Sequence, residues 1–315
     1  MSHPPLRPDR RALLKGGVLA GAAGALPAGA HAKAKPAHNG DPDPFVLAPL
    51  PPQAPAREFK LPVADGVSLW GWDTGGHGTP VVLFHSRTGS GQVWAYQQPA
   101  LAKAGYRVIG YSRRGFAGSD GGPKERPGTG SGDLQALLDA LKIGKFHAVS
   151  TAAGGFVAAD YALSHGERLL SLTLACSILG VSDDQIGVMN KALRQDFFNA
   201  LPPDFQELGP SYRAADPQGH ALWVQLHGAS QVPGAVEQPL ANAITLAALK
   251  TIKARTLLIC GDSDLIAPPP IKRAFAKAMP GSTLEVITEA GHSAYWERPA
   301  QFNRAVIGFM EARSA

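Results

Sequence analysis

The sequence predicts an α/β fold with a mostly parallel central sheet, helices on both faces and a helical cap. Three observations support this. Short apolar runs alternate with amphipathic stretches, the pattern of strands buried on both faces. Loops after several of these runs carry histidine, serine, aspartate and glycine, as expected where ligands bind at the carboxyl ends of strands. Residues from about 180 to 250 show helical patterns and no convincing strand, which predicts a cap inserted between two strands.

The first 32 residues have the pattern of an export signal. Arg10-Arg11 and Lys15 are followed by a weakly apolar Gly/Ala run up to Ala30, and Ala30-His31-Ala32 is a small-x-small cleavage site. This order predicts a twin-arginine signal peptide, transient contact with the twin-arginine export machinery, and a bacterial periplasmic or secreted protein. The apolar run is too short and too rich in glycine to form a stable membrane span.

Composition narrows the function further. Residues 1–32 contain four basic residues and one acidic residue, so their removal lowers the formal net charge from +5 to +2. No basic cluster is interleaved with aromatic residues, and nucleic-acid binding therefore has no support. Residues 33–56 are rich in proline and alanine, which predicts a flexible lead-in, and residues 57–315 are long enough for one domain. Cys176 and Cys260 are most simply buried small hydrophobes, although neighbouring strands could pair them after export.

Each element is predicted from its own run. Residues 57–73 form a strand pair around Asp65-Gly66, a dipeptide that favours tight hairpins. Ser182-Asp183-Asp184-Gln185 is a capping-box pattern that starts the first cap helix. No internal repeat is found. The predicted strands are 81–84, 106–111, 146–149, 172–176, 256–260 and 284–288, and the predicted helices outside the cap are 93–104, 134–141, 154–165, 271–279 and 301–312.

The unusual residues lie in four places that follow strands. Residues 85–91 follow the first parallel strand, and residues 112–120 follow the next. Residues 150–154 read Ser-Thr-Ala-Ala-Gly between a strand and a helix, where a tight turn needs small neighbours. Asp262 and Asp264 follow a later strand, and His292 lies in an Ala-Gly-His-Ser loop after the last one.

These landmarks make residues 57–313 resemble the α/β-hydrolase fold family, in the branch of small esterases, lactonases, C–C bond hydrolases and haloperoxidase-like enzymes. The resemblance implies that His292 is the catalytic histidine and Asp264 the acid that orients it, with Asp262 as the alternative. A carboxylate on one ring nitrogen fixes the tautomer and leaves the other nitrogen free to accept a proton. The resemblance also implies an oxyanion hole made by the amides of Ala153 and Arg87.

The sequence departs from the family pattern at the nucleophile, because the position of the attacking serine is Ala152. Ser150 and Thr151 are interpreted as structural, and Ser86 is the strongest of three weak substitutes. The loop departs too: the usual His-Gly pair reads His85-Ser86, and Arg87 replaces a small or apolar residue. We interpret His85 as a residue that stabilises this loop and that also belongs to the predicted substrate-binding set.

Three explanations of Ala152 remain open. A natural enzyme could use the His292–Asp264 dyad without a covalent intermediate, either to activate water or to abstract a proton in lyase or isomerase chemistry. The serine could have been replaced by engineering, although an uncut signal segment is typical of a natural sequence. The protein could instead be a non-catalytic binder. We favour the first explanation, in which His292 activates water for hydrolysis.

The substrate is predicted to be a small hydrophobic ester, lactone or ketone, because aromatic residues are frequent in the cap and after His292. We place His85, Ser86, Tyr295 and Trp296 in the substrate-binding set, and expect most cap aromatics to be cap core. No dinucleotide signature follows a strand and no cluster has metal-ligand spacing, so we predict neither a cofactor nor a metal. The cap residues in question are Phe197, Phe198, Phe205, Tyr212, Trp223 and Leu226.

Overall fold

A computed structural model describes residues 48–312, apart from residues 195, 233–234 and 236. The predicted signal peptide, residues 1–32, and the lead-in up to residue 47 lie outside this range. Within the described ranges, no helix is long and apolar enough to cross a membrane.

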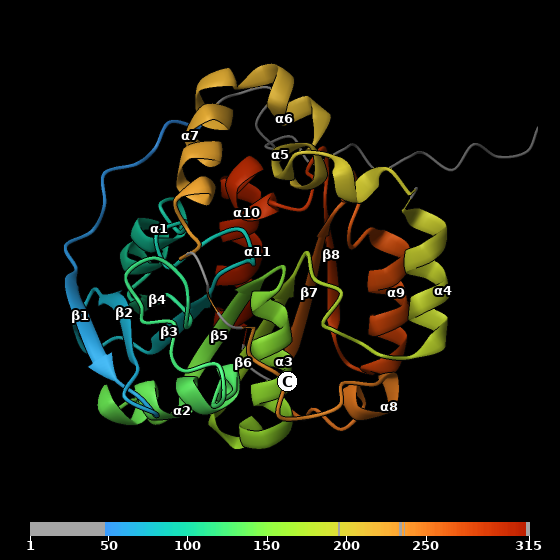
Figure 1. The fold of residues 1–315 in the computed structure, drawn as a ribbon. Coiled ribbons are helices and arrows are strands. Elements are labelled where there is room, and N and C mark those ends of the chain that lie inside the picture. Colours follow the sequence, from blue (N-terminus) through green and yellow to red (C-terminus); the bar gives the residue numbers. More distant parts are fainter. Residues whose placement is uncertain (1–47, 195, 233–234, 236, 313–315) are drawn as a thin grey trace, which may run out of the picture. The chain divides into compact units, whose positions relative to one another are not determined.

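The described residues form one sheet in the order β1-β2-β4-β3-β5-β6-β7-β8, shown in Figure 1. Strand β1 pairs antiparallel with β2, and β2 pairs antiparallel with β4, whereas all later pairs are parallel. The predicted mostly parallel sheet is therefore confirmed. The strands are β1 (Arg57–Pro62), β2 (Ser68–Asp73), β3 (Pro80–Phe84), β4 (Arg107–Tyr111), β5 (Phe146–Thr151), β6 (Leu169–Ala175), β7 (Thr256–Gly261) and β8 (Thr283–Ile287).

The first two strands are joined by the tight turn that the sequence predicts. Asp65 and Gly66 both have positive φ, 56° and 73°. Two consecutive positive φ values are the signature of the type I′ turn, whose twist matches that of the flanking strands. Asp-Gly supplies them at low cost because glycine has no Cβ and aspartate tolerates the left-handed region.

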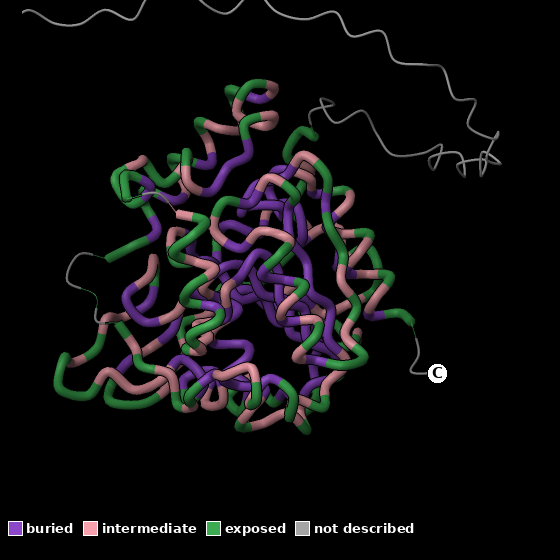
Figure 2. The backbone as a smooth tube through the Cα atoms, turned by 90° about the vertical axis from the view of Figure 1, so that its right-hand side faces the viewer, coloured by how far each residue is buried: buried purple, intermediate pink, exposed green. Residues whose placement is uncertain are grey.

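Alternate residues of the parallel strands face two separate cores. Val82, Leu172 and Leu258 belong to one cluster, whereas their neighbours Val81 and Leu257 belong to the other. Burial on both faces explains the continuous apolar runs in the sequence. In Figure 2, the buried residues accordingly gather at the centre of the molecule.

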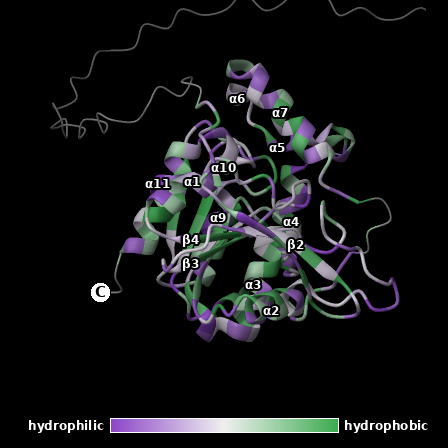
Figure 3. Ribbon diagram, turned by 90° about the vertical axis from the view of Figure 1, so that its left-hand side faces the viewer, coloured by the Kyte–Doolittle hydropathy of each residue, from purple (hydrophilic) through white to green (hydrophobic). Residues whose placement is uncertain are grey.

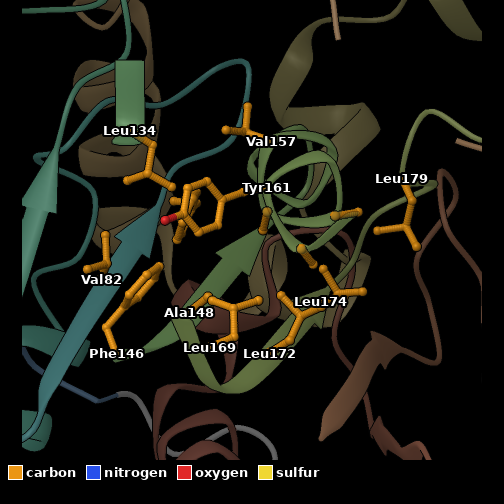
Figure 4. Close-up of a cluster of buried hydrophobic side chains, with 14 of the residues drawn as sticks. Val82, Leu134, Phe146, Ala148, Val157, Tyr161, Leu169, Leu172, Leu174 and Leu179 are labelled. Atoms are coloured by element: carbon orange, nitrogen blue, oxygen red, sulfur yellow. The ribbon is translucent and has the colours of Figure 1, made fainter. Parts of the chain in front are cut away.

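Helices cover both faces of the sheet. The first face is covered by α2 (Gly130–Ala140), α3 (Gly154–His165) and α9 (Pro269–Ala278), with the short α8 (Leu246–Leu249) between α3 and α9. Its core includes Phe146 and Tyr161, whose ring centroids are 5.8 Å apart (Figure 4). The second face is covered by α1 (Gln97–Lys103) and α11 (Pro299–Glu311), next to α10 (Ala294–Glu297). Helix α11 alternates hydrophilic and hydrophobic residues along its length, as a helix with one buried face should (Figure 3).

The segment between β6 and β7 carries the predicted cap. Its helices are α4 (Asp184–Leu193), η2 (Phe198–Ala200), α5 (Pro203–Glu207), α6 (Pro210–Ala215) and α7 (Pro217–Gly228), followed by α8. Helices α5, α6 and α7 each begin with proline, which is favoured at the first helical position because its missing N–H would have no partner there. The predicted capping box at residues 182–185 does not form. Helix α4 begins at Asp184, and the Asp183 carboxylate accepts the amide of Leu246 instead of capping α4.

Two smaller expectations can be compared with the structure. The described end of the lead-in is held in place, because Ala54 exchanges two hydrogen bonds with the Gln98 side chain and Gln53 donates to the carbonyl of Ala95. This part therefore differs from the flexible segment that was predicted. Cys176 and Cys260 are buried free thiols.

Candidate active site

Ala152 stands at the apex of a strained turn between β5 and α3. Its φ of 50° lies in the left-handed region, which costs a residue with a Cβ about 1–2 kcal/mol. The Ala152 amide donates to the carbonyl of Ala175, 3.0 Å away, at the end of the neighbouring strand β6. A Cβ on Gly154 would lie only 2.2 Å from the Phe84 carbonyl oxygen, so the turn needs glycine there. The backbone thus keeps the sharp turn although the side chain is a methyl group.

The three residues considered as substitutes for the serine, Ser150, Thr151 and Ser86, do not replace it; the hydroxyl residues that line the cavity are Ser177 and Thr88. Ser150 is buried and its Oγ donates to the carbonyl of Thr173, 2.7 Å away. Thr151 is fully buried and does not line the cavity that contains Ala152. Ser86 is also buried, 3.1 Å from the Thr88 Oγ1, and does not line the cavity either.

His292 and Asp264 form a hydrogen-bonded pair. The Nδ1 atom of His292 lies 2.9 and 3.0 Å from the two carboxylate oxygens of Asp264. The Asp264 Oδ1 atom also accepts the amides of Ile266 and Ala267, both at 2.8 Å. These contacts place the ring proton on Nδ1 and leave Nε2 as the proton acceptor. Asp262, the alternative acid, lies exposed and accepts the hydroxyl of Ser263 instead.

The charges of the pair support each other in a buried place. Burial alone would raise the pKa of Asp264, but the His292 charge and the donated hydrogen bonds outweigh it and lower that pKa. Burial alone would lower the pKa of His292, but the Asp264 carboxylate outweighs it and raises that pKa. The pair therefore favours an ionised aspartate beside a histidine that readily accepts a proton.

The loop that carries His292 is bonded to the cap. The carbonyl of Glu207, the last residue of α5, accepts the amides of His292 at 2.6 Å and Ser293 at 3.1 Å. A Cβ on Gly291 would lie 2.4 Å from the Gly209 amide nitrogen, so the two backbones approach closely. The cap segment 207–209 thus fixes the backbone around the base.

A buried carboxylate closes the same junction. Glu297 of α10 accepts the amides of Gly291, Gly209 and Ser293 at 3.0, 2.8 and 3.2 Å. Burial raises the pKa of Glu297 to about 7, against the lowering effect of these three amides. No motif in the sequence marks Glu297, because its three partners meet only in the folded chain.

The predicted oxyanion residues share the cavity with the base. Ala153 and Arg87 both line it together with Ala152 and His292. Neither the Ala153 nor the Arg87 amide donates to another described residue. The Arg87 side chain is exposed, and its carbonyl accepts the side-chain amide of Gln231 at 3.0 Å. Two backbone N–H donors in the cavity of the base are the groups that can bind an oxyanion as it develops.

The cavity measures about 400 Å³ and is more polar than expected. Arg194 lines it; its Nη2 atom donates to the carbonyl of Ile266 at 3.1 Å, and its buried Nε atom has no hydrogen-bond partner among the described residues. Of the cap aromatics, Phe198 lines the cavity and Trp223 is buried in the second core. Phe197 and Phe205 are exposed, so the prediction that most of these residues form a cap core is wrong for both. The remaining lining residues are Thr88, Phe156, Ser177, Ile178, Asn199, Pro203, Gln206, Glu207, Gln231 and Ile266.

His85, predicted at the substrate, braces its loop. It is fully buried and does not line the cavity. Its Nδ1 donates to the carbonyl of Ser86 at 2.7 Å, and its Nε2 accepts the amide of Arg113 at 3.0 Å. Burial, and then the Arg113 charge, hold the pKa of His85 well below its usual value, so the ring is neutral. His85 and Ser86 therefore lie outside the substrate-contacting set.

Tyr295 and Trp296 do not belong to the substrate-binding set, contrary to the prediction. Both are buried in the second core, and neither lines the cavity of Ala152 and His292. The Tyr295 hydroxyl lies 3.2 Å from Nε2 of His227, and the Trp296 ring nitrogen donates to the Tyr212 hydroxyl at 2.8 Å. Proximity to His292 in sequence did not place them at the site, because α10 turns both side chains into the core.

Comparisons with known proteins agree with this fold. Residues 79–223 match a family described as the alpha/beta hydrolase fold. BpoC of Mycobacterium tuberculosis, whose name suggests a non-heme bromoperoxidase, is 28% identical over 269 residues, which cover 78% of this chain and 98% of BpoC. Its solved structure has a TM-score of 0.62 at 26% identity and covers 80% of this chain and 98% of its own. The chain therefore has the α/β-hydrolase fold and is similar to these members of that family.

Two further relatives carry names of hydrolytic or degrading enzymes. The 2-hydroxy-6-oxononadienedioate/2-hydroxy-6-oxononatrienedioate hydrolase of Burkholderia vietnamiensis is 28% identical over 258 residues, covering 76% of this chain and 89% of its own. The structure of Est816, described as an N-acyl homoserine lactone degrading enzyme, has a TM-score of 0.64 at 25% identity and covers 79% and 99%. Enzymes acting on small molecules are thus well represented among its relatives. Within the described residues, no group of three His, Cys, Asp or Glu side chains could hold a metal ion.

The close approach at Gly154 predicts that Gly154→Ala will destabilise the protein. The new methyl group would overlap the carbonyls of Phe84 and His85, and overpacking of this kind costs about 1–3 kcal/mol or more. Urea unfolding measures the loss. Gly308→Ala is the matched control, because nothing lies within 4 Å of its Cβ and alanine favours a helix interior. Equal stability of the two variants would contradict the packing argument.

The buried carboxyl of Glu297 predicts a pH-dependent contribution to stability. Its pKa in the folded protein, about 7, exceeds the ordinary value of 4.5, so this contribution is fully present below pH 4.5 and is lost as the pH rises through 7. The free energy of unfolding of the wild type relative to Glu297→Gln should therefore fall by roughly 2–3 kcal/mol between pH 4.5 and pH 8. Urea unfolding at several pH values measures this difference, and a difference that does not change with pH would refute the raised pKa of Glu297.

Proposed function

We propose that the protein hydrolyses a small ester or lactone without a covalent serine intermediate. In this proposal, His292 removes a proton from a water molecule and Asp264 stabilises the charged imidazole that results. The water oxygen attacks the substrate carbonyl carbon, and the amides of Ala153 and Arg87 bind the developing oxyanion. The observation that carries the proposal is the 2.9 Å contact between His292 Nδ1 and Asp264, beside a strained turn whose residue 152 has no hydroxyl.

The surroundings of Ala152 favour water as the attacking group. Ala152 lines the cavity with His292, and a methyl group leaves room where a serine hydroxyl would project. Proton transfer by a positioned base contributes about 10²–10⁴-fold to a rate, so catalysis does not require the covalent step. Phe156, Phe198 and Ile266 provide apolar contacts for the substrate, while Arg194 favours a polar or anionic group on it.

The decisive comparison is between two single variants on a panel of aliphatic esters and lactones. His292→Ala should lower kcat/KM by about 10²–10⁴-fold because the base is lost. Ala152→Ser should become labelled by a fluorophosphonate, whereas the wild type should hydrolyse its substrate without being labelled. The control is His77→Ala, a change at an exposed histidine in the loop before β3.

The outcomes separate the alternatives. Unchanged hydrolysis by His292→Ala would rule out the proposed mechanism. Turnover that incorporates no ¹⁸O from labelled water would favour lyase or isomerase chemistry at the same dyad. Stoichiometric binding of a substrate without any turnover would favour a non-catalytic binder.

We further propose that the protein leaves the cytoplasm by the twin-arginine route, on the basis of Arg10-Arg11 and the apolar run that follows. Replacing both arginines by lysine should retain the protein in the cytoplasm of a bacterial host. Fractionation and immunoblotting measure the distribution, with Arg7→Lys as the control. Normal export of the double variant would exclude this route.

A further inference from the structure

A second titratable group shares the cavity with His292. Glu207 ends α5 of the cap and lines the cavity together with Ala152 and His292. Glu207 is buried, with 7% of its surface exposed. The cap therefore contributes a carboxyl group to the place where the substrate carbonyl would bind. Neither the family resemblance nor the sequence motifs assign it a role.

The Glu207 carboxyl is held in position from two sides. Its Oε1 atom accepts the hydroxyl of Thr88 at 2.8 Å, and Thr88 follows Arg87 in the predicted oxyanion loop. Its Oε2 atom faces the hydroxyl of Ser293 at 3.4 Å, next to the base. The Glu207 carbonyl is fixed as well, since it accepts the amides of His292 and Ser293. The carboxyl thus bridges the oxyanion loop and the loop that carries His292.

The electrostatic surroundings make Glu207 able to hold a proton. Burial raises its pKa, although the His292 charge and the Thr88 and Ser293 hydroxyls act in the opposite direction. An ionised Glu207 would raise the pKa of His292 further, after the larger effect of Asp264, and this coupling is absent when Glu207 holds a proton. The other charged or titratable groups around it are Arg87, Arg194, Asp264 and Tyr295.

We propose that Glu207 is a catalytic acid that protonates the leaving oxygen while His292 deprotonates the attacking water. This inference rests on the proposed hydrolytic function and deepens it. A substrate carbonyl bound by the amides of Ala153 and Arg87 has the cap on its other side. Glu207 is the carboxyl that the cap presents there.

The protons and bonds balance in this scheme. His292 Nε2 takes one proton from water, the water oxygen bonds to the carbonyl carbon, and the oxyanion forms. When the intermediate collapses, the bond between carbon and the leaving oxygen breaks, and the Glu207 carboxyl gives its proton to that oxygen. The products are an acid and an alcohol. Transfer of the proton on His292 to the Glu207 carboxylate, through water, restores the starting state.

Two esters with the same acyl group test this role. Ethanol is a poor leaving group that needs a proton, whereas nitrophenolate leaves without one. Glu207→Gln should therefore lower kcat/KM for ethyl butyrate by about 10²–10⁴-fold and leave kcat/KM for p-nitrophenyl butyrate nearly unchanged. The matched control is Glu285→Gln, an exposed carboxyl on the edge strand β8, which should change neither rate.

A second measurement does not depend on turnover. NMR titration of the His292 ring should give nearly the same pKa in Glu207→Gln as in the wild type, because a Glu207 that holds its proton is replaced by a neutral amide of similar shape. Equal losses on both esters, or a His292 pKa that falls in Glu207→Gln, would overturn the acid role while leaving the proposed hydrolysis intact. If the wild type shows no hydrolysis that depends on His292, the proposed function and this inference are both overturned.

Discussion

The candidate site depends on the contact between the turn after β5 and the end of β3. Gly154 lies so close to the carbonyls of Phe84 and His85 that no side chain fits between them. This contact sets Ala152 at its positive φ and brings the Ala153 amide to the same cavity as Arg87. The geometry is therefore a property of the backbone. Loss of the serine hydroxyl removes an attacking atom and leaves the surrounding arrangement in place.

The sheet and its helices could be predicted because local patterns determine them. Strands buried on both faces require continuous apolar runs, and helix α3 occupies the predicted residues 154–165. His292 and Asp264 could be predicted for a similar reason. Each follows a strand of a parallel sheet, and the carboxyl ends of those strands meet at one edge. The alternation of apolar and helical patterns thus places both residues at this edge, and the resemblance to the α/β-hydrolase fold family pairs them.

The rest of the site depends on contacts that local patterns do not encode. Tyr295 and Trp296 follow His292 closely, but their direction is set by α10, whose four residues are too few to show a periodicity. Glu207 and Glu297 are ordinary glutamates in sequence. Their importance arises when the cap segment 207–209 meets the loop 291–293, and no local signal reports that meeting. The polarity of the cavity was not predicted because it comes mainly from cap side chains, which also meet only in the folded chain.

The bonding between cap and base has a consequence for how this fold can be altered. In a modular enzyme, a cap can be exchanged to change specificity while the catalytic core is kept. Here the carbonyl that accepts the His292 amide belongs to Glu207 of the cap, and Glu297 joins Gly209 to Gly291. A cap grafted from a relative would have to supply that backbone acceptor and a glycine at the crossing. Cap and base are consequently one structural unit, and a cap can be exchanged only together with the segment 207–209 that holds the loop of His292.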